Sequence, residues 1–200
     1  MASEKKQKES KIYQIKVTLK YSHPPIWRRI QVAGETTFHE LHYILQRVMG
    51  WDDSHLHQFI IGDRTYGGSD DESGAAPRRR DSGSLALGEV VHREKSKFIY
   101  EYDFGDSWQH VLLVERILPL EEGVQYPRCL AGRGACPPED CGGVYGYYAK
   151  LEALRDPKHP AHKEIIDWMN EDFDPEAFDL EDVNARLKWL SEHRFGAGNF

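Results

Sequence analysis

Three cysteines lie within thirteen residues of a segment rich in proline and glycine: Cys129, Cys136 and Cys141. Thiolates this close in sequence can hold a tetrahedral Zn²⁺ when a fourth ligand comes from elsewhere in the chain. We expect His110 to be that ligand because it lies on a predicted strand leading toward the segment, with His55 or His57 as alternatives. Two other interpretations stay open: three buried thiols that pack as small apolar groups, and a Cys136–Cys141 disulfide.

A second group of reactive side chains occupies the turn-forming run from Asp103 to His110. The run offers two carboxylates, a hydroxyl and an imidazole, which could perform acid–base chemistry or complete a metal site. With a carboxylate from the cysteine-rich segment, the candidate catalytic residues are Asp103, Asp106, His110 and Glu139. The competing interpretation is turn chemistry, because Asp and Ser side chains often bond to their own backbone in turns, and Trp108 is expected in the core.

Two histidines at alternate positions, His55 and His57, follow the first predicted helix. In a strand they would point the same way and could bind a metal ion or a polar substrate. The alternative is a pair of partly exposed strand histidines that make structural hydrogen bonds.

These residues must be positioned by a sheet and by helices. Apolar patterning predicts strands at 12–19 and 26–32, a hairpin at 55–61 and 64–66, and an antiparallel hairpin at 97–103 and 108–118. Thr37 and Glu40 form a capping box, and Gly50 is placed to end the first helix. Further helices are predicted at 147–154, from 159 onward and after Asp179.

The order of these elements predicts an α+β fold. We expect a small antiparallel or mixed, β-grasp-like sheet with one helix packed on it, then a Cys/Pro/Gly-rich loop and a C-terminal helical segment. A disordered tail is expected at 1–11 and a single domain at 12–195, divided into a sheet part (12–118), the cysteine-rich loop (119–146) and a helical part (147–195). Frequent proline and glycine argue against helix or strand between 126 and 146, and the polar stretch 67–84 is expected to be a long loop.

The net charge of the chain bears on which partners it can bind. The 200-residue chain carries a net charge of −7, and the stretch 164–182 holds nine acidic residues and no Lys or Arg. This charge opposes nucleic-acid binding without excluding it, since Arg28, Arg29 and the run Arg78–Arg80 could form a local basic patch. The sequence offers neither a secretory signal nor a membrane span, so we expect a cytoplasmic protein whose cysteines are thiols or metal ligands.

Several motifs together resemble the plasmid pRiA4b ORF-3-like protein family. They are PIWRR at 25–29, GW at 50–51 with HLHQF at 55–59, YDFGDSWQH at 102–110, and CPPEDCGG at 136–143 with GY at 146–147. The resemblance covers roughly 12 to 190. It implies an α+β domain and a setting among plasmids, insertion elements and free-standing cytoplasmic proteins. It implies no activity, cofactor or catalytic residue.

Three hypotheses about function follow. The first is a binding module stabilised by zinc through Cys129, Cys136, Cys141 and His110. The second is a metal-assisted hydrolase that uses the carboxylate and histidine cluster. The third is an accessory factor for mobile-element DNA, based on the setting of relatives and on the arginine clusters. The sequence identifies neither a substrate nor a partner.

Overall fold

The computed structural model describes residues 10–67, 83–169 and 172–194. The predicted tail therefore lies outside the described residues except for its last two positions, as do Arg78–Arg80 and most of the predicted loop 67–84. No described helix has both the length and the apolar character needed to cross a bilayer.

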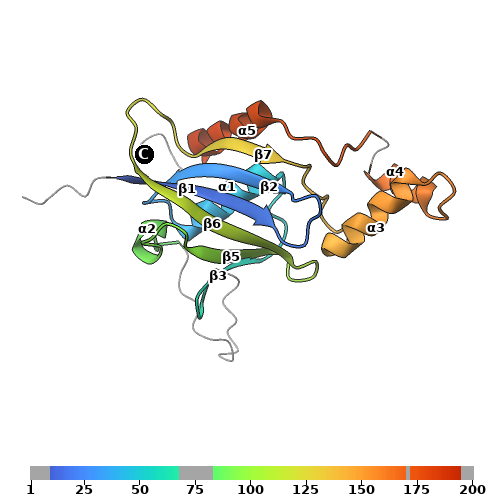
Figure 1. Cartoon of the computed structure of the whole chain (residues 1–200), viewed down its shortest axis with the longest axis horizontal. Helices are drawn as coiled ribbons and strands as arrows, with labels where there is room; N and C mark the ends of the chain where they lie inside the picture. Colours follow the sequence, from blue (N-terminus) through green and yellow to red (C-terminus); the bar gives the residue numbers. More distant parts are fainter. Residues whose placement is uncertain (1–9, 68–82, 170–171, 195–200) are drawn as a thin grey trace, which may run out of the picture.

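Within the described residues, one antiparallel sheet in the order β4-β3-β5-β6-β1-β2-β7 forms the centre of the molecule (Figure 1). Its strands are β1 (Lys11–Leu19), β2 (Trp27–Ala33), β3 (His57–Ile61), β4 (Arg64–Tyr66), β5 (Lys97–Tyr102), β6 (Trp108–Pro119) and β7 (Arg128–Arg133). The α+β prediction is confirmed. The sheet is larger than the β-grasp-like sheet that was predicted, and every described strand pair is antiparallel.

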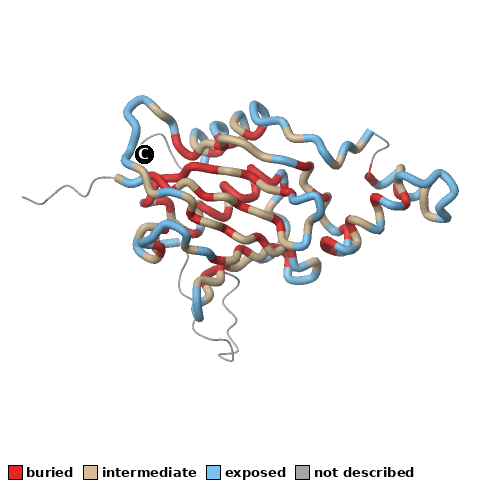
Figure 2. The backbone as a smooth tube through the Cα atoms, in the orientation of Figure 1, coloured by how far each residue is buried: buried red, intermediate tan, exposed pale blue. Residues whose placement is uncertain are grey.

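Alternation along the central strands decides which side chains reach the core. In β1, Ile15, Val17 and Leu19 are buried, whereas the intervening Lys16 and Thr18 are partly exposed on the other face. Strands β1 and β6 pair over nine residues of β1, and β2 pairs on the other side of β1. Figure 2 shows the result as buried and partly exposed positions that alternate along neighbouring strands.

Helix α1 (Phe38–Met49) crosses one face of this sheet (Figure 1). It begins with the predicted capping box: the Glu40 amide donates to Thr37 Oγ1 at 3.1 Å, and the Thr37 amide donates to Glu40 Oε2 at 2.8 Å. It ends at Gly50, whose φ of 104° is in the left-handed region. The buried face of α1 includes the apolar residues Phe38, Leu41, Ile44, Leu45 and Val48.

Strand β7 corrects the prediction that 126–146 holds no strand. Among the strands of the described residues it pairs with β2 alone, from Gln31↔Arg128 to Trp27↔Arg133, with an irregular step in register between Arg29 and Ile30. On its other edge α5 (Leu180–His193) supplies Asn184, whose Oδ1 accepts the Cys129 amide at 2.9 Å and whose Nδ2 donates to the Cys129 carbonyl at 3.0 Å. A side-chain amide thus takes the place of a neighbouring strand.

The remaining helices follow the predicted order. Besides the single turn α2 (Leu87–Val90), they are α3 (Gly143–Arg155), α4 (His162–Met169) and α5, which Asp179 caps as predicted. Helix α3 begins four residues earlier than expected because two glycines permit a tight entry. Gly143 has a φ of 67°, and a Cβ on Gly146 would overlap the Cys141 carbonyl oxygen.

Candidate metal centre

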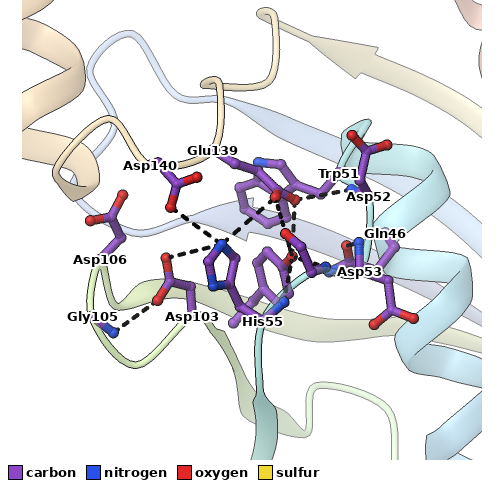
Figure 3. Close-up of polar contacts among 12 residues, drawn as sticks. Gln46, Trp51, Asp52, Asp53, His55, Asp103, Gly105, Asp106, Glu139 and Asp140 are labelled. Carbon is purple, nitrogen blue, oxygen red and sulfur yellow. Dashed lines mark hydrogen bonds and ion pairs between the residues drawn. The ribbon is translucent and has the colours of Figure 1, made fainter.

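His55 lies among three carboxylates at one end of the sheet (Figure 3). Its Nε2 is 3.3 Å from Asp140 Oδ1, 3.8 Å from Glu139 Oε2 and 3.9 Å from Asp103 Oδ2. One ligand atom each from His55, Asp103 and Asp140 falls within 4.8 Å of the other two. No other group of this kind occurs in the described ranges.

Three segments far apart in sequence bring these ligand atoms together. His55 lies in the connection from α1 to β3, Asp103 directly follows β5, and Asp140 precedes α3. The Asp103 amide donates to the Leu56 carbonyl at 2.8 Å, which ties the first two segments together. Asp103 and Asp140 both have left-handed backbones, with φ of 56° and 57°, a conformation that Asp tolerates better than most residues.

Glu139 is held beside this group by three donors. Its Oε1 accepts hydrogen bonds from the Asp52 amide at 3.0 Å and from the Tyr102 hydroxyl at 2.9 Å. Its Oε2 accepts a close hydrogen bond from the Ser54 hydroxyl. The carboxylate therefore has a fixed orientation, with one oxygen toward His55.

The turn chemistry foreseen for the β5–β6 hairpin is also present. Asp103 Oδ1 accepts the Gly105 amide at 2.9 Å, and Asp106 Oδ2 accepts the Gly142 amide at 3.0 Å. Asp103 thus has two roles: its Oδ1 stabilises the turn, and its Oδ2 faces His55 in the candidate ligand group (Figure 3). Asp106 joins the hairpin to the start of α3 rather than to the ligand group.

His110 lies apart from the candidate centre. It is fully buried on β6, its Nδ1 is 3.1 Å from the Trp108 carbonyl, and burial lowers its pKa to about 4. Trp108 was expected in the core, and a residue two positions along a strand shares the same face. That signal was available in the sequence and places His110 in the core as well.

The three cysteines do not form a ligand group with one another or with His110 among the described residues. All three are free thiols, and burial raises the pKa of each, to about 12 for Cys141. The guanidinium of Arg28, which is 3% exposed, lies close enough to Cys129 and Cys136 to favour their ionised forms. A zinc site here stays a prediction.

His57 also faces away from the candidate centre, because β3 begins at His57 and leaves His55 outside the strand. The two side chains therefore do not share a face. The His57 ring stacks on that of His42 with centroids 3.5 Å apart, beneath α1. Burial lowers the pKa of both imidazoles to about 3.

His42 belongs to a closed ring of hydrogen bonds that joins α1, β5 and the connection after α1, next to the candidate metal centre. Gln46 Nε2 donates to the Tyr100 hydroxyl at 2.9 Å, and that hydroxyl lies 2.8 Å from His42 Nδ1. His42 Nε2 is 2.6 Å from Asp53 Oδ1, and the Asp53 amide returns to Gln46 Oε1 at 2.9 Å. Burial lowers the pKa of His42 and keeps its imidazole neutral. We assign the Tyr100 proton to the hydrogen bond with Nδ1 and the His42 proton to Nε2, which then donates to Asp53 Oδ1.

The candidate centre is open on one side. The side chain of Asp140 is 75% exposed and that of His55 is 29% exposed, whereas Asp103 and Glu139 are largely covered. A ligand group with one exposed flank leaves room for water or substrate on a bound ion. Sequence reasoning named Asp103 and Glu139 and gave His55 as an alternative, but it missed Asp140, Ser54 and Tyr102. Asp140 and Tyr102 lie in motifs of the family resemblance, and Ser54 lies between two of them; this was their sole signal.

Comparisons with known proteins agree with that resemblance. The model of the family described as plasmid pRiA4b ORF-3-like protein matches residues 11–182. An uncharacterized protein, y4hQ, of Sinorhizobium fredii is 37% identical over 189 residues, which are 92% of this chain and 96% of that protein. The crystal structure of MM3350, a protein of unknown function from Methanosarcina mazei, has a TM-score of 0.80 and 40% identity. The match covers 88% of this chain and 99% of the MM3350 chain.

Proposed function

We propose that this chain, which belongs to the plasmid pRiA4b ORF-3-like protein family, binds a divalent metal ion and uses it for hydrolysis. The ligands are His55, Asp103 and Asp140. The observation that carries the proposal is the approach of their ligand atoms to within 4.8 Å at a partly open surface.

The donor atoms favour particular ions. One imidazole nitrogen and two carboxylate oxygens, without sulfur, suit Zn²⁺ or Mn²⁺. Three protein ligands with an open flank are typical of catalytic rather than structural zinc sites. A divalent ion in such a position lowers the pKa of a water molecule and polarises a carbonyl or phosphoryl oxygen.

Glu139 has the position of a general base. It lies beside the ligand group but outside it, and its carboxylate is oriented by Tyr102, Ser54 and the Asp52 amide. A carboxylate held next to a site for activated water can accept the proton that the water gives up. Glu139 is therefore assigned proton transfer, and the other three residues are assigned metal binding.

Metal content and metal titration test the site. Tag-free protein purified without chelator should contain about one Zn²⁺ or Mn²⁺ per chain by mass spectrometry, and calorimetry on stripped protein should give one site. Asp103→Asn removes a charged ligand and should weaken binding at least about tenfold. Asp63→Asn, at the exposed β3–β4 turn, is the matched control for loss of one carboxylate.

Two further variants separate the alternatives. Cys136→Ser should leave metal content unchanged. If this variant lost the metal and Asp103→Asn kept it, the metal site would be assigned to the cysteine segment instead. Glu139→Gln should keep the metal and lose hydrolysis of an activated ester. Equal metal affinity in wild type and Asp103→Asn would refute the proposed centre.

The other two hypotheses have less support. The cysteine segment lacks a ligand group in the described ranges. Of the basic features considered for DNA, Arg28 is buried and Arg29 is paired with Glu115 at 2.7 Å. Both hypotheses stay predictions.

A further inference from the structure

A cavity of about 100 Å³ lies between the β1–β2 turn and α3 and shares no lining residue with the metal centre. Its apolar walls come from Pro24, Pro25 and Ile26 on the turn and from Tyr147 and Leu151 on α3. Figure 1 shows the start of α3 beside this turn. Tyr147, Leu151 and Arg155 are spaced by four residues, so one face of the helix lines the cavity.

The walls are fixed by hydrogen bonds between segments. The His23 amide donates to the Tyr148 hydroxyl at 2.6 Å, which joins the turn to α3. The Ala135 amide donates to the Pro175 carbonyl at 3.0 Å, which joins the end of β7 to the segment before α5. The cavity is therefore formed before a ligand arrives, which lowers the entropic cost of binding.

The charge of the lining differs from that of the whole chain. Arg133 and Arg155 both line the cavity and are exposed, and neither guanidinium is paired with a carboxylate among residues 10–67, 83–169 and 172–194. Glu176 is the one acidic residue of the lining. The lining is therefore net positive in a chain of net charge −7, which favours an anionic ligand.

Tyr147 contributes a wall of the cavity rather than a polar contact. This residue is 1% exposed and lines the cavity, and its hydroxyl is buried out of reach of a molecule the size of water. The cationic groups available to a ligand are therefore those of Arg133 and Arg155.

We propose that this cavity binds a small branched aliphatic carboxylate, with its carbon body against the proline and leucine walls and its carboxylate between Arg133 and Arg155. The volume of the cavity sets the size of the aliphatic part of the ligand. A cavity of about 150 Å³ holds the six carbons of benzene, so one of about 100 Å³ holds about four carbons. Guanidinium groups recognise carboxylates through paired N–H donors. This inference does not depend on the metal centre.

Titration with isovalerate, followed by ligand-observed NMR, tests the proposal, and isovaleramide is the uncharged ligand of the same shape. Isovalerate should bind at least tenfold more tightly than the amide. Arg155→Gln should weaken isovalerate binding about tenfold and leave isovaleramide binding unchanged. Arg64→Gln removes the same charge from the exposed strand β4 and should bind isovalerate as wild type does.

The carboxylate could belong to a free acid or to the C-terminus of a peptide that ends in leucine, and acetyl-Gly-Gly-Leu distinguishes the two. Tighter binding of the peptide than of isovalerate would assign the cavity to chain ends, and weaker binding would assign it to free acids. No saturable binding of either compound to the folded wild-type protein, or equal affinity for acid and amide, would overturn the proposal.

Discussion

Stability should fall steeply as the pH drops from 7 to 5, because two buried imidazoles, His42 and His110, and the partly exposed imidazole of His57 are neutral in the folded protein. Burial lowers the pKa of His42 and His57 to about 3 and that of His110 to about 4. In the unfolded chain each imidazole binds a proton near pH 6.5. As the pH falls, the imidazoles therefore take up protons in the unfolded chain before they do in the folded protein. The stabilisation of the folded state by these neutral imidazoles is complete above pH 6.5 and is lost as the pH falls toward 3.

The size of the effect follows from the two pKa values. A group that titrates at 6.5 unfolded and at about 3 folded loses about 2 kcal/mol of stabilisation between pH 7 and pH 5. His42 and His110 are at most 1% exposed and count fully, whereas His57 is partly exposed and is counted at about half that value. The sum is about 5 kcal/mol, comparable with the whole stability of many domains.

Urea unfolding followed by circular dichroism at pH 7, 6 and 5 measures this loss. His42→Gln should reduce it by about 2 kcal/mol, whatever the variant does to stability at pH 7. His92→Gln, at an exposed position, is the control and should show the loss of wild type. A free energy of unfolding that is flat between pH 7 and 5, or a His42→Gln slope equal to wild type, would refute the assignment of neutral buried imidazoles.

Two further predictions concern the elements that position the centre. Thr37→Ala removes the side-chain acceptor of the α1 capping box and should cost about 1 kcal/mol, seen as a melting temperature lower by about 2–4 °C; an unchanged melting temperature would mean that the cap contributes nothing. Gly146→Ala places a methyl group on the Cys141 carbonyl oxygen and should cost about 3 kcal/mol in urea unfolding. Gly62→Ala meets no neighbour within 4 Å and should cost only about 1 kcal/mol for its φ of 62°, so equal losses in the two variants would contradict the overlap.

Local signals in the sequence were sufficient for several elements. The capping box of Thr37 and Glu40, the stop at Gly50 and the cap at Asp179 all depend on residues within one turn of the helix end, and all three are confirmed. Strand β7 was missed because its proline- and glycine-rich surroundings gave no periodicity. Its strand geometry comes instead from pairing with β2, about a hundred residues earlier.

The candidate centre shows the same limit. His55, Asp103 and Asp140 are separated by more than thirty residues at each step, and they meet because β3 pairs with β5 and the segment before α3 returns to the same end of the sheet. No spacing rule within one segment predicts such a meeting. A shift of two residues in the start of β3 also separated the two histidines: His55 lies outside the strand beside the carboxylates, and His57 stacks on His42.

The contact between Asn184 and β7 has a consequence for self-association. An edge strand normally presents unpaired amides and carbonyls that can recruit another chain into the sheet. Here both backbone groups of Cys129, near the start of the strand, are already occupied by one side chain of α5. Asn184→Ala would return them to solvent, and the same surface would then become a template for edge-to-edge aggregation. One asparagine thus covers two backbone groups at an edge of the sheet where another chain could otherwise pair.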